Sequence, residues 1–415
     1  MKIRIKPKVL KHQHDFIVSE AKHPALVSGY GGGKTHAFIL KAIQEHLRPE
    51  NRGKRGLIAE PTVKMLQHIL IPEITKTLRA MGVKYEHLKS LSMIRTPYGE
   101  IILHSAENYM RWAGLNLAWG GIDEAALLKD EQAWNMLLSR LRDRGTLTGF
   151  ITTTPEGKNW VFEKWVKNPK NGYMLYKARS TDNPFLPEEF ILSLKQNYPK
   201  KLLNQYLNGE FVTLQGNVFD MYSERNIDDW EYQPGLETFF CMDFGYNRPS
   251  VLLGQEDYLG RIHIFEEFPD RNIKTFDLAL KMKDRAMDLG FWEEGETPVY
   301  CDPAGTAHTS SADYSDVAIL RQLGFKPIYT TSAMLRRIKT GVTIIQMLLE
   351  NSLGEVRLFI NKKNCPNLDS SLTNYQYDDN GEPLKDGVND HDIDALRYFV
   401  IHRFGVDFML GRGVE

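Results

Sequence analysis

The chain has 415 residues, which is more than one ordinary domain holds, so we expect two or three domains. It has the 42% apolar and 25% charged residues of a soluble globular protein, and no apolar run is long enough for a transmembrane helix. Its three cysteines are widely spaced, which argues against a disulfide framework or a zinc site, and a net charge of −1 means that contacts with nucleic acid need local basic patches.

The first half of the chain alternates short apolar runs with helical patterns. This alternation predicts an α/β fold, in which parallel strands form one sheet and helices cover its faces. The expected strands are Ala25–Ser28, Gly56–Ala59, Glu100–His104, Leu117–Ile122 and Leu147–Thr152. The expected helices between them are His36–His46, Val63–Met81 and Gln132–Leu141.

A glycine-rich stretch, SGYGGGKT, follows the first expected strand and opens the first expected helix. This context predicts a phosphate-binding loop, in which Lys34 binds the β- and γ-phosphates and the Thr35 hydroxyl binds Mg²⁺. The usual pattern has glycine where this chain has Ser28, so the alternative is a glycine-rich turn with an accidental GKT. The loop residues assigned to nucleotide binding are Ser28, Gly31, Gly32, Gly33, Lys34 and Thr35.

A second apolar strand, LAWGGIDEAA, ends in two acidic residues. In phosphate-loop ATPases a carboxylate at this place holds the Mg²⁺ shell, which predicts that role for Asp123. Glu124 would then polarise the attacking water as a general base. The alternative is that Asp123 only caps a helix.

Three smaller signals surround these motifs. Gln13 precedes the first strand and could meet the adenine ring, although a surface helix explains this segment nearly as well. Arg111 lies just upstream of the acidic strand, where a surface arginine is the default interpretation. The threonines Thr152–Thr154 end a strand and could sense the γ-phosphate, but strand ends rich in threonine are common.

The second half predicts an antiparallel meander of three consecutive strands, which the first half lacks. Asp243 and Asp302 each end an apolar run, and a buried carboxylate is costly unless it is paired or binds a cation. Near the C-terminus, Asp390 and Asp394 lie one turn apart on an expected helix. We therefore expect Asp243, Asp302 and Asp394 to bind Mg²⁺ or Mn²⁺, which would also offset the repulsion among the helix aspartates. The alternative is that they are turn and cap residues that never meet.

A series of motifs, in order along the chain, resembles the large terminase subunit of tailed double-stranded DNA bacteriophages. They are SGYGGGKT, GGIDEAA, TTTPEGKN, STDNPFLP, NGEFV, CMDFGYN, CDPAG and DHDIDALRY. The resemblance implies an N-terminal phosphate-loop ATPase with a mainly parallel sheet and a C-terminal RNase H-like α/β nuclease domain. The expected bounds are 1–208 for the packaging ATPase domain, 209–235 for a connector and 236–415 for the nuclease domain.

The resemblance also implies a function, that of a viral DNA-packaging motor subunit. Such a subunit hydrolyses ATP to move double-stranded DNA into a procapsid, and it cuts concatemeric DNA with a metal-dependent endonuclease. An arginine of one subunit can complete the ATPase site of its neighbour, which is the role expected for Arg111. The other residues carried over are Lys34 and Thr35 for phosphate and Mg²⁺, Asp123 and Glu124 for the acidic pair, and Asp243, Asp302 and Asp394 for the nuclease.

The cofactors implied are ATP with Mg²⁺ at the ATPase site and Mg²⁺ or Mn²⁺ at the nuclease site. The partners implied are double-stranded DNA, the portal protein, the procapsid and the small terminase subunit. The subunits would form a homo-oligomeric ring on the portal, with a monomer as the alternative state in solution. We expect no membrane contact and a location in the host cell cytoplasm.

Two other classes of function compete with this interpretation. A helicase-nuclease or defence nuclease would use ATP to gate cutting without packaging, and it predicts further helicase motifs, which the sequence lacks. A DNA-binding scaffold with relic sites predicts broken catalytic positions. Lys34, Glu124 and the three nuclease carboxylates are all intact, which disfavours the scaffold.

Overall fold

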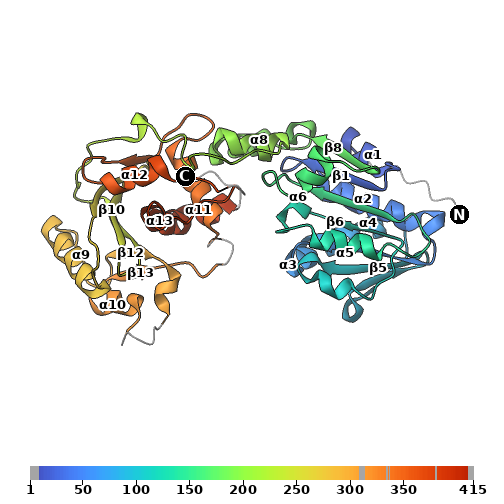
Figure 1. Ribbon diagram of the computed structural model, residues 1–415, viewed down its shortest axis with the longest axis horizontal. Coiled ribbons are helices and arrows are strands. Elements are labelled where there is room, and N and C mark those ends of the chain that lie inside the picture. The colour runs from blue at the N-terminus through green and yellow to red at the C-terminus, as the bar shows by residue number, and fades with distance from the viewer. Residues whose placement is uncertain (1–8, 308–313, 333–334, 336, 379–380, 410–415) are drawn as a thin grey trace. The chain divides into compact units, whose positions relative to one another are not determined.

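A computed structural model describes residues 9–307, 314–332, 335, 337–378 and 381–409 of the chain (Figure 1). Their internal contacts divide the chain into two compact units. The first consists of Met1–Ile191 and Lys201–Thr213, and the second of Leu192–Lys200 and Leu214–Glu415. The predicted domain bounds stay a prediction. The two units differ from them most at Leu192–Lys200, which lies in the second unit although it falls within the predicted ATPase domain of residues 1–208.

The first unit is built on an eight-stranded sheet with the order β3-β4-β5-β2-β6-β7-β1-β8. Neighbouring strands are parallel except at the pairs β3–β4 and β4–β5, so the predicted mainly parallel sheet is confirmed. The strands are β1 His23–Ser28, β2 Lys54–Glu60, β3 Glu86–Leu88, β4 Met93–Thr96, β5 Gly99–Ser105, β6 Trp119–Ile122, β7 Thr148–Thr153 and β8 Tyr173–Ala178.

Helices cover both faces of this sheet, and each face has its own apolar core because successive strand residues point to opposite sides. The single helix predicted over Val63–Met81 is interrupted by a wider turn at Leu66–Leu70, since Pro72 has no N–H to donate to the carbonyl of His68. The helices are α1 Lys11–Ile17, α2 Lys34–Leu47, α3 Val63–Met65, α4 Ile71–Ala80, α5 Gln132–Arg140, α6 Trp160–Phe162, α7 Glu188–Asn197 and α8 Lys200–Asn208.

The segment Leu192–Lys200 is attached to the second unit by hydrogen bonds to backbone carbonyls. Ser352 donates its N–H to the carbonyl of Tyr198 at 3.1 Å, and Asn351 donates from Nδ2 to the carbonyl of Gln196 at 3.2 Å. The ring of Tyr198 also packs 5.3 Å from the ring of Phe408. The chain therefore contributes to the second unit before it has completed the first.

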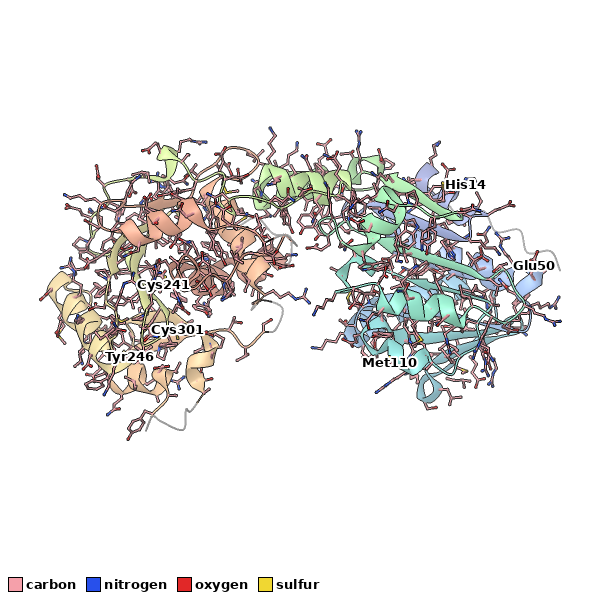
Figure 2. All side chains as sticks on the ribbon, viewed as in Figure 1. His14, Glu50, Met110, Cys241, Tyr246 and Cys301 are labelled. Carbon is pink, nitrogen blue, oxygen red and sulfur yellow. The ribbon has the colours of Figure 1, made fainter. Side chains whose placement is uncertain are left out.

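The second unit is built on a six-stranded sheet with the order β13-β12-β9-β10-β11-β14. Strands β9, β10 and β11 form the predicted antiparallel meander, whereas β12, β13 and β14 join it by parallel pairing. Cys241 and Cys301 lie on the adjacent strands β9 and β12 and are fully buried, as their apolar surroundings predict (Figure 2). The strands are β9 Glu237–Asp243, β10 Ser250–Glu256, β11 Ile262–Phe268, β12 Pro298–Cys301, β13 Lys326–Ile328 and β14 Leu358–Ile360.

The C-terminal helix α13, Asp390–Met409, packs on this sheet, with the rings of Phe239 and Phe399 stacked 3.9 Å apart. It begins at Asp390, so Asp390 and Asp394 are one turn apart as expected. Within the described parts of the chain, no helix is long and apolar enough to cross a membrane. The other helices are α9 Thr275–Leu289, α10 Asp316–Gln322, α11 Ile338–Leu349 and α12 Pro366–Asn374.

Candidate functional site

The loop between β1 and α2 has the backbone geometry of a phosphate cradle. Gly31 and Gly33 have φ angles of 71° and 78°, a region that residues with a side chain rarely adopt. Ser28 is the last residue of β1 and is not among the residues with positive φ, so it needs no glycine there. A Cβ at Gly32 would lie 2.4 Å from the Ser28 hydroxyl, which explains the glycine at that position. The departure from the usual pattern at Ser28 therefore leaves the loop geometry intact.

Lys34 opens α2, and its ammonium points back toward the loop and the acidic strand end. Nζ lies 3.3 Å from the carbonyl oxygen of Gly29, to which it donates, and 3.5 Å from Oε1 of Glu124. Asp123 is fully buried at the end of β6 and accepts hydrogen bonds from the Thr35 and Thr152 hydroxyls. The structure thus brings together the loop lysine and threonine and both residues of the acidic pair.

Buried negative charges shape the electrostatics of this site. Burial and the charge of Glu124 raise the pKa of Asp123 to about 6, although hydrogen bonds from Thr152 and Thr35 and the charge of Lys34 lower it. Oδ2 of Asp123 and Oγ1 of Thr154 are buried and have no hydrogen-bond partner among the described residues. These free oxygens fit a hydrated Mg²⁺, which keeps several of its waters and needs acceptors for them.

Glu124 differs from Asp123 in exposure and in backbone conformation. Its side chain is 22% exposed, so it can reach a water molecule at the site. Its φ of 45° places a non-glycine residue in the left-handed region, a strain that is commonly found at functional sites. Oε2 accepts a hydrogen bond from the N–H of Thr154 at 3.1 Å, which connects Glu124 to the threonine segment after β7.

A third carboxylate at this place, Glu60, was missed by the sequence analysis. It ends β2, the strand next to β6, and is 1% exposed. Burial, and then the charges of Asp123 and Glu124, raise the pKa of Glu60 to about 10. Its Oε2 has no hydrogen-bond partner in the described part of the chain. The signal was available, because GLIAE is an apolar run that ends in a carboxylate, as do the runs before Asp243 and Asp302.

The structure places Gln13 beside the phosphate loop and Arg111 on the surface of the first unit. The amide of Gln13 donates to the carbonyl of Gly33 at 3.0 Å and accepts from the N–H of Leu10 at 2.8 Å, so Gln13 braces the phosphate loop. Arg111 is exposed, and among the described residues it makes no contact with Lys34 or Glu124. An adenine contact by Gln13 and a role of Arg111 in a neighbouring subunit both stay predictions.

In the second unit, Asp394 and Asp302 both lie near enough to Asp243 for their charges to act on it. Asp243 is the last residue of β9, and Asp302 follows β12, which pairs with β9 in parallel. Burial raises the pKa of Asp243, and the charges of Asp394 and Asp302 raise it further, while a hydrogen bond from His391 lowers it. Nδ1 of His391 lies 2.9 Å from Oδ2 of Asp243. Asp302 also caps the turn that follows it, by accepting from the N–H of Ala304 at 2.8 Å.

Both carboxylate oxygens of Asp394 are already paired with basic side chains of the chain. Nζ of Lys385 donates to Oδ2 at 2.5 Å, and Nε of Arg397 donates to Oδ1 at 2.9 Å. Within the residues that the structure describes, no three His, Cys, Asp or Glu side chains form a group that could hold a metal ion. As they stand, these side chains do not fit a metal centre, and the repulsion among the helix aspartates is offset by Lys385 and Arg397.

The two other aspartates in the first turn of this helix have separate surroundings. Asp392 accepts hydrogen bonds from the hydroxyls of Ser250 at 2.7 Å and Ser371 at 2.9 Å, so it joins β10 and α12 to α13. Asp390 is 6% exposed, and its Oδ1 has no partner among the described residues. Sequence reasoning missed His391, Lys385 and Arg397, although Arg397 follows Asp394 at the spacing of a helical ion pair.

One family model matches part of the chain. Residues 61–225 match the family model described as "Terminase large subunit, T4likevirus-type, N-terminal". The predicted resemblance to large terminase subunits is confirmed. No curated protein matches the sequence.

The terminase fold extends over nearly the whole chain. The large terminase of a thermophilic bacteriophage is 19% identical, with a TM-score of 0.71, and the match covers 94% of this chain and 98% of that one. The same terminase in complex with ADP is 18% identical, with a TM-score of 0.69 and the same coverage. Its complex with ATP-gamma-S is also 18% identical, with a TM-score of 0.68 and the same coverage. At these identities the likeness shows the fold, and it confirms the predicted combination of ATPase and nuclease folds.

Proposed function

We propose that this protein is the ATP-hydrolysing subunit of a motor that packages double-stranded viral DNA into a procapsid. The observation that carries the proposal is the arrangement of Lys34, Thr35, Asp123 and Glu124 at one end of the first sheet. A cradle of backbone N–H groups, a buried lysine and an adjacent acidic pair are the parts that phosphate-loop ATPases use. The large terminase of the thermophilic bacteriophage, which has the same fold, is described in complex with ADP.

In this proposal each residue has a distinct task. The N–H groups of the loop and Nζ of Lys34 bind the phosphate oxygens, while Thr35 and Asp123 would hold Mg²⁺. When bound, the metal supplies positive charge that stabilises the phosphates in the transition state. Glu124 accepts the proton of the attacking water, for which its exposure and its position beside Lys34 are suitable. Thr154, hydrogen-bonded to Glu124, would transmit the state of the site along the chain.

We further propose that residues 236–415 form a DNA endonuclease that uses Mg²⁺ or Mn²⁺. Its support is that Asp243 and Asp302 stand at the ends of the paired strands β9 and β12, with Asp394 of α13 near enough for its charge to act on Asp243. In this structure Lys385 and Arg397 pair with both oxygens of Asp394. The proposed need for a metal ion therefore rests on the preference of Mg²⁺ and Mn²⁺ for carboxylate ligands, and not on a formed metal site. His391 and Tyr398, which contact Asp243, would orient that carboxylate.

The predicted partners and location also belong to this proposal. The domain of residues 1–208 would act in a homo-oligomeric ring on the portal, with Arg111 reaching a neighbour's nucleotide. The small terminase subunit would deliver the DNA in the host cell cytoplasm. Packaging of DNA into purified procapsids with ATP tests the whole proposal. ATP-dependent protection of DNA from added nuclease supports it, whereas ATP hydrolysis and cutting without any protected DNA would favour a helicase-nuclease or defence nuclease.

A further inference from the structure

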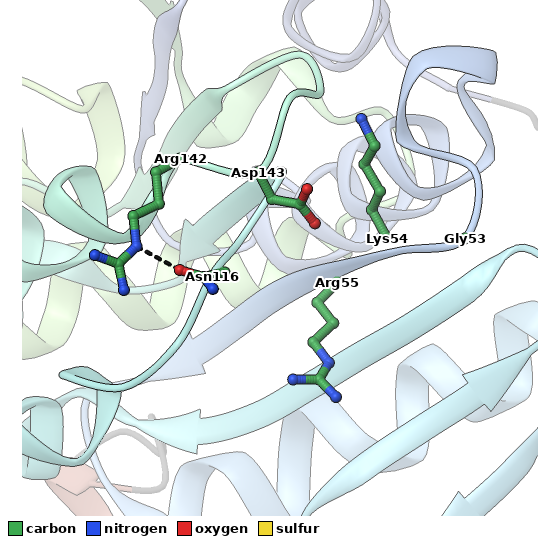
Figure 3. A pocket seen from close by; sticks show the side chains of 6 residues that line it. All are labelled: Gly53, Lys54, Arg55, Asn116, Arg142 and Asp143. Carbon is green, nitrogen blue, oxygen red and sulfur yellow. Dashed lines mark hydrogen bonds between the residues drawn. The ribbon is translucent and has the colours of Figure 1, made fainter.

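A basic pocket lies at the opposite ends of the strands from the nucleotide site. It has a volume of about 410 Å³ and is lined by Gly53, Lys54, Arg55, Asn116, Arg142 and Asp143 (Figure 3). Lys54 is the first residue of β2, whereas Glu60, beside the acidic pair, is its last. Since β2 and β6 are parallel, the pocket and the proposed ATPase site lie at opposite ends of these strands.

Two cations of this pocket form no ion pair with a carboxylate among the described residues. Nζ of Lys54 donates to the backbone carbonyl of Arg144, and Nε of Arg142 donates to the side-chain oxygen of Asn116. Both acceptors are neutral, and among the described residues neither Lys54 nor Arg142 has a carboxylate within ion-pair distance. Arg55 does pair with Glu100, at 3.0 Å. The pocket thus holds two positive side chains that are free of ion pairs, opposed by the carboxylate of Asp143 in its lining.

Lys54 at the start of β2 and Arg142 in the loop after α5 lie on segments that a buried asparagine connects. Asn51 is fully buried and accepts from the N–H of Thr146 at 2.9 Å, while its amide donates to the carbonyl of Glu45 at 2.7 Å. The loop residues are therefore fixed relative to one another before any ligand arrives. Two further basic residues, Arg52 and Arg144, are exposed on the adjoining segments.

The lining selects the chemistry of the ligand. It contains no apolar side chain, so an acidic peptide would have charged partners here but no apolar surface on which to bury its own side chains. A phosphodiester backbone needs only cations and hydrogen-bond donors, and it offers phosphates in succession to a row of basic residues. A formal net charge of −1 for the whole chain means that this positive surface is a local concentration rather than a general excess.

We propose that this pocket, with Lys54 and Arg142 as its phosphate-binding residues, is a contact site for the backbone of double-stranded DNA. The inference rests on the proposed function, which supplies the DNA. It adds that the first unit binds DNA at the strand ends that lie away from the nucleotide. Substitutions there should change DNA affinity without changing nucleotide affinity.

The test measures binding of the full chain to a labelled DNA duplex, without divalent metal, over a series of salt concentrations. The double variant Lys54→Gln, Arg142→Gln should bind about ten- to thirty-fold more weakly near 0.15 M salt, and the slope of log K against log salt should fall by about 1.8. The matched control, Lys76→Gln with Arg79→Gln on α4, removes the same charges from exposed positions elsewhere and should bind as the parent does. ADP binding should be unchanged in both variants.

A second variant separates loss of the site from a folding defect, because it is expected to bind DNA more tightly than the parent. Asp143 is the only carboxylate that lines the pocket, so Asp143→Asn should strengthen DNA binding about two- to five-fold. Parent-like affinity and slope in the double variant, or no gain in Asp143→Asn, overturns the pocket assignment and leaves the proposed function standing. A parent chain that binds no DNA at all overturns both. Equal weakening by the control pair would show only nonspecific attraction and also refutes the site.

Discussion

The ammonium of Lys385 lies 2.5 Å from Oδ2 of Asp394, and Nε of Arg397 lies 2.9 Å from the other oxygen of the same carboxylate. Asp394 and Arg397 are both about 95% buried, whereas half of the Lys385 side chain is exposed. The pair with Arg397 is therefore the one shielded from water. Removing Asp394 would leave a buried guanidinium without its counter-charge, which is costly.

We predict that Asp394→Asn destabilises the metal-free protein by about 3 kcal/mol. From the sequence alone, removing one charge from an aspartate cluster would relieve repulsion and leave the protein at least as stable. The ion pairs reverse the expected sign of this change in stability. Urea denaturation measures the change, with Lys385→Met as the control, which should cost less than about 1 kcal/mol because that lysine is half exposed. Plasmid cleavage should also fall sharply in Asp394→Asn. A variant as stable as the parent would contradict the buried pairing.

Glu124→Gln should lower the rate of ATP hydrolysis by about 10²- to 10⁴-fold, because the amide cannot accept the proton of the attacking water. Nucleotide binding should persist, since Lys34 and the loop are untouched. Steady-state hydrolysis and calorimetric ADP binding separate these effects. Lys34→Ala is the comparison variant, and it should weaken both binding and turnover. Near-normal hydrolysis by Glu124→Gln would remove Glu124 from the mechanism.

Glu60 should make the stability of the nucleotide-free protein fall as pH rises. In the unfolded chain this carboxyl loses its proton near 4.5, whereas in the folded protein its pKa is about 10. Between these values the unfolded state binds fewer protons than the folded state, so each pH unit costs up to about 1.4 kcal/mol of stability. Above pH 10 no further loss is expected from this group.

Glu60→Gln removes that titration and should stabilise the protein at pH 8, with little difference at pH 4.5. Urea denaturation at several pH values, without nucleotide or metal, measures both curves. The exposed Glu50 provides the control, because Glu50→Gln removes a carboxylate that is already in water. Parallel curves for the parent and Glu60→Gln would show that Glu60 is ionised in the folded protein.

Arg111→Ala should hydrolyse ATP weakly at every protein concentration, with a loss of about 10³-fold if the arginine completes a neighbour's site. Its exposure and its lack of contact with its own Lys34 and Glu124 are consistent with such a role. Mixing Arg111→Ala with Lys34→Ala should restore part of the activity, since each variant supplies what the other lacks. If the mixture is no more active than its components, Arg111 acts within its own subunit or only in folding.

The phosphate loop and the acidic strand could be predicted because each is a local pattern with a local structural cause. Strand, glycines and helix stand next to one another in the sequence, and the positive φ angles of Gly31 and Gly33 follow from that order. Glu60 also ends an apolar run, but its place beside Asp123 could not be predicted, because it depends on β2 lying beside β6 in the sheet. Sheet order is set by contacts between distant segments, which periodicity does not encode.

The same limit applies to the acidic helix. Its start at Asp390 and its burial could be predicted from spacing and apolar content. The partners of its aspartates come from elsewhere in the fold, such as Ser250 and Ser371 for Asp392. The sequence predicted a bound cation as the source of compensation for Asp394. The structure places cations of the chain itself there, and a lysine nine residues upstream carries no sequence signal of that pairing.

The assignment of Leu192–Lys200 to the second unit has a consequence for the order of synthesis. A ribosome delivers these residues before Lys201–Thr213, which belong to the first unit, and long before Asn351 and Ser352, to which the segment hydrogen-bonds. The first unit can therefore close around Lys201–Thr213 while the preceding residues still await their partners. No single cut in the chain yields both units whole, so a protein expressed as two separate halves would leave one of them with a missing or a surplus piece.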